Sequence, residues 1–191
     1  MQGGGGYEIW QYTNRKSSKP KNEFRIGDLG THFPVIKTKN ILATFNRLKE
    51  ANENIVSEIV VDPDDKKSFY LKDPFDNILK VKEFSSFYAD KKNDVGGVFS
   101  AVIGVSNIDE SLELYAKVLG YDTVIYDKTD IFEDLTSLNN GNKKFRRILL
   151  AHSEKRTGGF ANLFGESQIE LIQAIENDPN KIFENRFWGD L

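Results

Sequence analysis

Gln168-Ile169-Glu170-Leu171-Ile172-Gln173 is the stretch around which this chain is organised, and its residues alternate as in a β-strand. Ile169 and Leu171 point to one side of such a strand, and Glu170 points to the other. A carboxylate in the middle of an apolar ribbon needs partners, since charged side chains are rarely buried alone. An outward-facing surface acid is the plainer interpretation. Glu170 is nevertheless the first candidate for a functional side chain.

A similar pattern occurs near the start of the chain, as Tyr7-Glu8-Ile9-Trp10-Gln11, and predicts a strand over residues 7–13. Glu8 precedes Glu170 by 162 residues, and the same offset separates Gly27-Asp28-Leu29 from Gly189-Asp190-Leu191. Two signals with one long offset indicate a duplication whose period is longer than most of the chain. Glu8 is therefore the predicted counterpart of Glu170.

A second repeat has an offset of 67 residues and identifies two similar units within the chain. Its five identities place Gly30, Val35, Ile36, Asn40 and Ile41 opposite Gly97, Val102, Ile103, Asn107 and Ile108. Each unit reads as strand, helix and three further strands. Asn40 is expected to cap the first helix and either Ser106 or Asn107 the second, because these side chains accept a hydrogen bond from the first helical turn.

The predicted strands of the first unit lie at 30–37, 55–61, 68–72 and 78–84, with a helix of about three turns after Asn40. Those of the second unit lie at 97–105, 121–126, 145–151 and 168–174, with a helix up to Gly120. Pro34 predicts an edge strand or a bulge, because proline has no N–H for a central ladder. The long loops at 127–144 and 152–167 are predicted to be lids, binding loops or interaction surfaces.

Composition excludes several classes of site. The chain has no cysteine, which rules out disulfides, thiolate zinc sites and cysteine nucleophiles and fits a cytoplasmic protein. A net charge of −3 provides no basic field to attract nucleic acid, and no apolar run is long enough to cross a membrane. The basic run of Lys143, Lys144, Arg146 and Arg147 is predicted to be a solvated strand surface.

Two motifs indicate a family. Asp73-Pro74-Phe75-Asp76-Asn77 precedes the last strand of the first unit, and SNIDESLELYAKVLGY at 106–121 forms the helix of the second. Together with the tandem βαβββ order, they resemble the vicinal oxygen chelate superfamily, which includes glyoxalase I, bleomycin-resistance proteins and extradiol dioxygenases. The resemblance implies an α+β fold of tandem βαβββ modules with curved mixed sheets. It also implies a cleft in which a divalent metal is chelated by a small oxygenated substrate.

The resemblance implies that metal ligands lie on the first and last strand of a module. Glu170 occupies the last-strand position of one module and is the predicted catalytic residue, and Glu170 and Glu8 are the predicted metal ligands. Lys80 occupies the matching position of the module between them, and a lysine cannot bind a metal at neutral pH. The first-strand histidine position aligns with Phe33 and Ser100, while His32 is one residue out of register. A complete metal site is therefore not expected within these residues, and the chain alone should not bind a divalent metal tightly.

The same resemblance predicts the organisation of the chain as part of a longer protein. Residues 1–21 are expected to be the last strand of a preceding module with its connector, 22–85 a complete βαβββ module, 86–96 a linker, 97–176 a second complete module, and 177–191 a connector to a module outside the chain. Long members of the family pair their modules first with second and third with fourth. The two complete modules here, the second and the third, would then not pair with each other.

Three functions remain open from the sequence. The longer protein could be a metal-dependent lyase or dioxygenase, in which Glu170 moves a proton. The chain could instead bind a small molecule without chemistry, as resistance proteins of this kind do, or be a degenerate structural repeat. An unpaired module would leave an apolar sheet face open, which predicts a homodimer. The residues expected to face or flank that open cleft are Ile103, Val105, Ile148, Leu150, Leu171 and Ile172.

Overall fold

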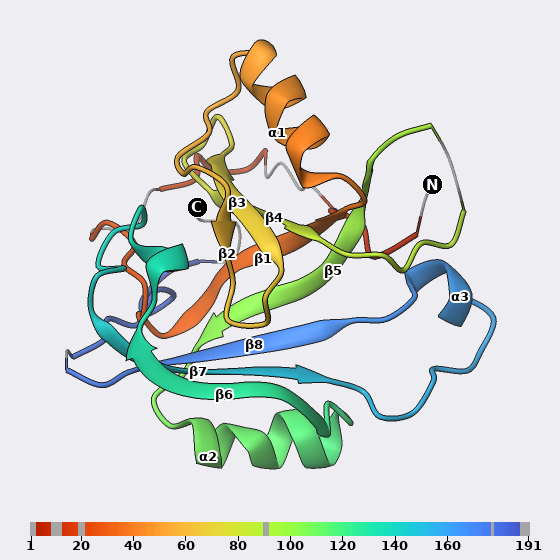
Figure 1. Ribbon diagram of the computed structural model, residues 1–191. Coiled ribbons are helices and arrows are strands. Elements are labelled where there is room, and N and C mark those ends of the chain that lie inside the picture. The colour runs from red at the N-terminus through yellow and green to blue at the C-terminus, as the bar shows by residue number, and fades with distance from the viewer. Residues whose placement is uncertain (1–2, 9–12, 19–21, 90–91, 177, 188–191) are drawn as a thin grey trace.

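The computed structural model describes residues 3–8, 13–18, 22–89, 92–176 and 178–187. Eight strands form one mixed sheet that curls into a half-barrel (Figure 1), in the order β2-β3-β4-β1-β5-β8-β7-β6. The predicted α+β class with tandem βαβββ modules and curved mixed sheets is confirmed. In the first module the elements are β1 (Gly30–Thr38), α1 (Ile41–Glu50), β2 (Val60–Val61), β3 (Lys67–Lys72) and β4 (Ile78–Glu83).

The second module repeats this order with two differences. It consists of β5 (Val95–Gly104), α2 (Ile108–Leu112), β6 (Thr123–Ile131), β7 (Lys144–Ala151) and β8 (Gln168–Ala174). Its helix continues as a π-helical turn, Glu113–Val118, and ends at Gly120, which has a φ of 75°. Two further short helices, the 3₁₀ turn Glu133–Leu135 and α3 (Ala161–Phe164), lie in the long loops.

The predicted Asn40 cap is confirmed, and of the two candidates for the second helix Asn107 is the cap. Asn40 accepts a hydrogen bond from the Ala43 N–H at 3.0 Å, and Asn107 accepts one from the Glu110 N–H at 3.3 Å. The caps satisfy N–H groups that have no partner inside the helix. The 67-residue offset therefore corresponds to equivalent positions in the two modules.

The two modules join edge to edge through their first strands. β1 and β5 are antiparallel neighbours at the centre of the sheet, while β4 runs parallel to β1 and β8 runs parallel to β5. The expectation that these modules lack each other as partners is therefore wrong. The open face that motivated the homodimer is absent for the same reason, so the homodimer stays a prediction without that argument. Pro34 lies in a central strand, not at an edge, and register shifts occur on either side of it.

The outer face of the sheet is covered by the two helices. Ile41 and Phe45 of α1 pack on Phe69 and Val81, and Ile108 of α2 packs over the second module. The residues beneath α2 include Ile148, Leu150 and Leu171, with Ile103 and Val105 beside them. These five were expected to face or flank an open cleft, and that expectation is wrong because the helix covers them. Of the six residues named, Ile172 alone belongs to the cluster on the inner face.

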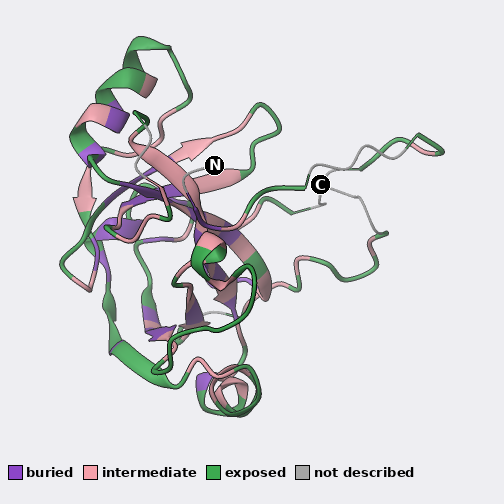
Figure 2. Cartoon of the chain, turned by 90° about the vertical axis from the view of Figure 1, so that its right-hand side faces the viewer, coloured by how far each residue is buried: buried purple, intermediate pink, exposed green. Residues whose placement is uncertain are grey.

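The inner face is filled by the chain itself. Residues 132–141, which we call the inner segment, place Phe132, Leu135 and Leu138 in one hydrophobic cluster with Phe33 and Tyr70 of the sheet. Figure 2 shows buried residues along the strands and exposed residues along the outer helices and loops. The segment is fixed at its end, since the Asn139 side chain donates to Phe24 O and the Asn140 side chain to Ile26 O. Of the loop predicted at 127–144 to be a lid, binding loop or interaction surface, residues 127–131 extend β6 (Thr123–Ile131) and the inner segment packs into the core.

Two further strand predictions are wrong. Residues 55–61 form a strand only at Val60–Val61, with an isolated bridge at Ile55. Tyr7, Glu8 and Thr13 are not in a strand, and the rest of the predicted strand, residues 9–12, lies outside the described residues. Instead, Gly3 and Gly5 hydrogen-bond to the start of β5. This contact needs Gly97, since a Cβ there would lie 2.3 Å from Gly5 O.

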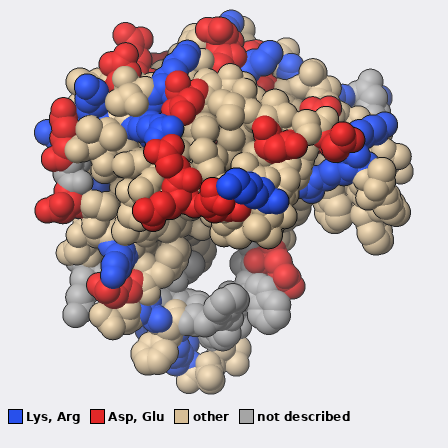
Figure 3. All heavy atoms as spheres, turned by 90° about the horizontal axis from the view of Figure 1, so that it is seen from below, with Lys and Arg blue, Asp and Glu red and all other residues tan. Residues whose placement is uncertain are grey.

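The charged surface is mixed in sign. Figure 3 shows basic and acidic side chains interspersed on one face of the molecule, so that face has no continuous basic surface. Within the described residues, no helix has the length and apolar character needed to cross a membrane.

Candidate functional site

Glu170 lies on the inner face of β8, buried at 3% exposure and bound to an arginine. Its Oε1 accepts a hydrogen bond from Arg147 Nε at 2.6 Å. Arg147 is on the neighbouring strand β7, is 1% exposed, and its guanidinium lies 4.6 Å from the ring centroid of Phe132. The unusual carboxylate of the apolar ribbon is therefore an ion-pair partner deep in the half-barrel.

Asp134 of the inner segment completes the arginine's set of partners. Its two carboxylate oxygens accept from Arg147 Nη1 at 2.7 Å and from Nη2 at 3.0 Å. This two-point geometry is the strongest that an arginine and a carboxylate make. Asp134 also lies 3.4 Å from Lys80 Nζ, so it connects the second module to the first.

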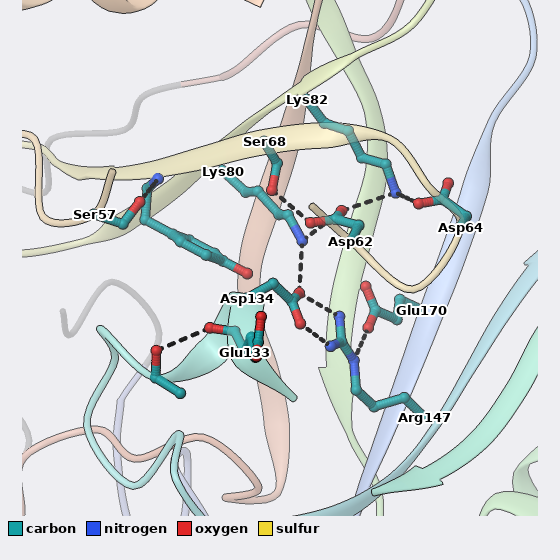
Figure 4. A network of polar contacts seen from close by, with 12 residues as sticks. Ser57, Asp62, Asp64, Ser68, Lys80, Lys82, Glu133, Asp134, Arg147 and Glu170 are labelled. Carbon is teal, nitrogen blue, oxygen red and sulfur yellow. Dashed lines mark hydrogen bonds and ion pairs between the residues drawn. The ribbon is translucent and has the colours of Figure 1, made fainter. Parts of the chain in front are cut away.

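The first module contributes four more charged side chains to this network (Figure 4). Lys80 Nζ lies 2.8 Å from Asp62 Oδ2, and Lys82 Nζ lies 3.0 Å from the same oxygen and 2.9 Å from Asp64. The Ser68 hydroxyl donates to the other oxygen of Asp62. We call these residues the central ion cluster: Asp62, Asp64, Lys80, Lys82, Asp134, Arg147 and Glu170. Its four carboxylates and three cations link all its members in one chain of contacts.

Burial and pairing act in opposite directions on these groups. Burial by itself raises the pKa of Glu170, but Arg147 and Lys80 outweigh it and hold that pKa below its usual value. Burial likewise raises the pKa of Asp62, and Lys80 and Lys82 reverse the shift. For Lys80, burial lowers the pKa, but Asp62 and Asp134 raise it further than burial lowers it. All three groups are therefore charged at neutral pH, which a buried side chain tolerates only with such partners.

The sequence analysis singled out Glu170 and Lys80 but missed the other five members of the cluster: Asp62, Asp64, Lys82, Asp134 and Arg147. Arg147 was read as part of a solvated basic run, and that interpretation is wrong because its side chain is fully buried. Its neighbour Arg146 fits the prediction better, since it points outward to Asp109 and Asp127. Period-two alternation was the signal that could have separated them, because Arg147 shares the inner face with Phe145 and Leu149. Asp134 carried no signal of its own within a polar loop.

The other predicted site residues do not join the cluster. Glu8 is exposed and lies outside any described strand. Phe33 and Ser100 are buried on β1 and β5, and neither offers a metal a strong ligand. His32, partly buried, lies beside the Asp28 carbonyl, with 2.7 Å between Nε2 and that oxygen. His32 was predicted to be one residue out of register with the inner face. This is confirmed, because its neighbour Phe33 takes the inward position.

A pocket of about 760 Å³ lies beyond the cluster, at the end of the half-barrel where β7 ends and β8 begins. Ala151 and Gln168, paired in the ladder, form part of its wall. The remaining lining comes from three segments, 86–88, 152–156 and 161–167. The loop at 152–167, predicted to be a lid, binding loop or interaction surface, therefore borders a pocket.

His152 is part of this wall. Its ring packs against Tyr121, with centroids 4.0 Å apart, and its Nε2 accepts a hydrogen bond from Arg156 Nη2. Burial and the Arg156 charge lower the pKa of His152, so the ring is neutral at pH 7. The side chain is therefore held in place within the pocket wall.

Comparisons with solved structures identify the fold. A putative dioxygenase from Bacillus subtilis superposes with a TM-score of 0.50 at 15% identity, over 81% of this chain and 44% of that chain. The chain has the vicinal oxygen chelate fold. Glyoxalase I from Zea mays (TM-score 0.47, 14% identity, 79% of this chain and 45% of that one) and a Streptomyces coelicolor methylmalonyl-CoA epimerase variant (0.40, 12%, 76% and 97%) are more distant matches.

These identities are low, so the likeness concerns the vicinal oxygen chelate fold alone. The chain spans less than half the length of the dioxygenase and glyoxalase chains that it matches. No protein-family model and no curated protein sequence matches this chain.

The residues at the metal positions implied by the vicinal oxygen chelate resemblance do not fit a divalent cation. The ladder pairs Val35 with Lys80 and Val102 with Glu170, so Lys80 and Glu170 are equivalent in the two modules. One position therefore carries a cation, and the carboxylate at the other is already bound to Arg147. Among the described residues, no group of three or more histidine or acidic side chains could hold a metal ion. Metal ligation by Glu170 and Glu8 stays a prediction that this geometry does not support.

Proposed function

We propose that this chain is a binding module of the vicinal oxygen chelate fold, which holds a small molecule in the pocket at the end of β7 and the start of β8. One contrast carries the proposal. In the centre of the half-barrel every charge of the ion cluster has an opposite charge within 3.4 Å, whereas the pocket beside it is open. A saturated ion cluster has no position left for a substrate oxygen, so binding takes place at the pocket.

The size and lining of the pocket support a small organic ligand. Its volume lies in the range of pockets that bind small molecules in proteins. Aromatic side chains (Phe87 and Tyr88) and both signs of charge (Arg156 and Glu166 among them) line it. Most of the other lining residues are polar, so the wall offers hydrogen-bonding groups as well as aromatic surface. The absence of cysteine is consistent with our proposal that the module works in the cytoplasm.

A pocket-filling substitution tests the proposal. Ala161→Trp places a large ring in the wall, and Ala51→Trp makes the same change at the exposed end of α1 as the control. We expect the melting temperature of the wild type and of Ala51→Trp to rise with the same members of a small-molecule set. Ala161→Trp should lose these shifts while melting at a similar temperature. Identical shifts in all three proteins would place binding elsewhere.

A metal-dependent lyase or dioxygenase, with Glu170 as its catalytic residue, is the second candidate. The observation that favours it is a carboxylate retained at the inner-face position of β8. Calorimetric titration of the chain with Zn²⁺, Mn²⁺ and Ni²⁺ separates the two candidates. The binding-module proposal expects no stoichiometric binding at micromolar concentrations. Binding that Glu170→Gln abolishes would support the metal-dependent candidate instead.

A further inference from the structure

Lys37, near the end of β1, is buried at 1% exposure and forms no ion pair with any described residue. Its Nζ donates to Ser86 O at 2.6 Å. The same atom lies 4.8 Å from the ring centroid of Phe87 and 5.9 Å from that of Phe84. An ammonium has three N–H donors, and the Ser86 carbonyl accepts from one of them. Within the described part of the chain, the other two donors face ring surfaces and have no oxygen acceptor.

The two other buried lysines of the inner face are different. Lys80 and Lys82 are each paired with carboxylates at 3.0 Å or less. Burying an ammonium without such a partner is costly, so its retention calls for another explanation. Burial lowers the pKa of Lys37, and the charge of Glu166 offsets this only in part.

The backbone makes room for this side chain. A Cβ at position 96 would lie 2.7 Å from Lys37 Cγ and 2.7 Å from Phe87 Cε1. Gly96 therefore lets the lysine stem and the Phe87 ring pack against one another. The ammonium is held in a fixed place between the rings and the Ser86 carbonyl.

Lys37 does not itself line the proposed pocket, but its ammonium contacts two residues that do. Ser86, which accepts the lysine's hydrogen bond, and Phe87, which packs on it, both line the pocket, as does Glu166. A ligand against the 86–87 segment would approach the two remaining N–H donors. A buried cation beside an open pocket is an arrangement that an anion can complete.

The rest of the lining narrows the class of anion. Lys155 and Arg156 are balanced by Glu154 and Glu166, which would repel a dianion such as phosphate. Phe87 and Tyr88 offer aromatic surface to an apolar ligand body. We propose that Lys37 anchors the carboxylate of a small monocarboxylic acid with an aromatic or apolar body in this pocket. This inference rests on the proposed function and adds the ligand class and the residue that selects it.

Benzoate is the probe, with benzyl alcohol as its neutral counterpart and inorganic phosphate as the dianion. Lys37→Met removes the charge at nearly constant length. Lys39→Met is the matched control, because Lys39 lies over the same Phe87 ring at 4.9 Å but is exposed. Calorimetry should show benzoate binding to the wild type and to Lys39→Met. Loss of a charge-assisted hydrogen bond should weaken binding to Lys37→Met by about tenfold or more.

A second readout separates a binding role from a structural one. If Lys37 serves only the fold, its replacement should lower the melting temperature. If it serves a ligand, methionine should melt at the same temperature or higher, because a buried charge has been removed. The ¹⁵Nζ resonance of Lys37 in the wild type should also move when benzoate is added, which needs no variant to fold.

Three results would overturn the inference. Equal benzoate affinity in the wild type and Lys37→Met would show that Lys37 does not bind the carboxylate, while the pocket could still be the binding site. Binding of phosphate or benzyl alcohol but not benzoate, abolished by Ala161→Trp, would refute the ligand class while the proposed function stands. An unmoved Lys37 resonance at saturating benzoate would show that the lysine does not meet the ligand.

Discussion

The two modules of this chain share a backbone plan but place opposite charges on its inner face. Lys80 of β4 and Glu170 of β8 occupy equivalent positions, each beside the equivalent valine of the first strand. On the neighbouring strands, Tyr70 pairs with Lys80 and Leu149 pairs with Glu170. The residues two positions earlier, Ser68 and Arg147, are therefore equivalent as well. A carboxylate at both positions would need a cation from outside. With one lysine, one glutamate and an arginine, the chain supplies its own cations, and Asp134 links them.

Of the changes that test this asymmetry, Arg147→Met should cause the largest loss of unfolding free energy. It removes the cation shared by Glu170 and Asp134, and both carboxylates would stay buried with fewer partners. Breaking a buried ion pair from one side costs about 3–5 kcal/mol of unfolding free energy. Urea denaturation measures the loss. Arg146→Met, the exposed neighbour on the same strand, is the control and should cost about 1 kcal/mol or less. Equal losses would refute the ranking of the two arginines.

Acidification should give the next largest effect. The pKa values of Glu170 and Asp62 lie below their ordinary values of 4.5 and 3.8 in the folded state, because their cations outweigh burial. Groups with a lowered folded pKa stabilise the fold above their unfolded pKa, and this contribution falls as the pH drops toward the folded pKa. The unfolding free energy should therefore decrease from pH 5 to pH 2. Buried pairs are weakly screened, so the dependence should persist in 1 M NaCl. A pH-independent stability would contradict the cluster.

Lys80→Met tests the first-module side and should cost less than Arg147→Met. Both partners of Lys80 keep another cation, since Asp62 retains Lys82 at 3.0 Å and Asp134 retains Arg147. We expect a loss of about 1–3 kcal/mol, the cost of removing one partner of a buried polar group. The measurement is again urea denaturation. A loss as large as that of Arg147→Met would mean that the cluster is not organised around the arginine.

Substitutions of the helix caps should cause the smallest losses of stability, and the losses should be nearly equal in the two modules. Asn40→Ala and Asn107→Ala each remove one hydrogen bond to the first helical turn, and each should cost about 1 kcal/mol. Thermal denaturation of both variants checks the comparison. A large difference between them would show that the modules diverge in their helices as well as in their inner faces.

Local patterns explain why much of the fold was readable from sequence. The caps and the alternation of β8 depend on residues a few positions apart, and the 67-residue offset matches two such local patterns. All of them appear in the structure. The strand predicted at 55–61 failed over most of its length, and the one predicted at 7–13 failed at its described residues. An apolar run by itself does not provide a neighbouring strand to bond with.

The candidate site was only half readable for a related reason. Glu170 was identified because a carboxylate interrupts an apolar ribbon, and the alignment placed Lys80 opposite it. Arg147 looked like one of several solvated basic residues, and Asp134 looked like any acid of a long loop. Their contacts span up to 54 residues of sequence, and no local pattern records such a distance.

The sequence by itself determined the 67-residue repeat, the order of helix and strands in each module and the charge at each equivalent position, because these depend on periodicity and on residue type. Only the tertiary structure decided that the two modules pair with each other, that the loop after β6 fills their inner face, and that Lys37 is buried against two residues that line a pocket. Those outcomes depend on which surfaces meet when the sheet curls. A charge can be buried there only if the folded chain brings an opposite charge, or leaves room for one, at the same point.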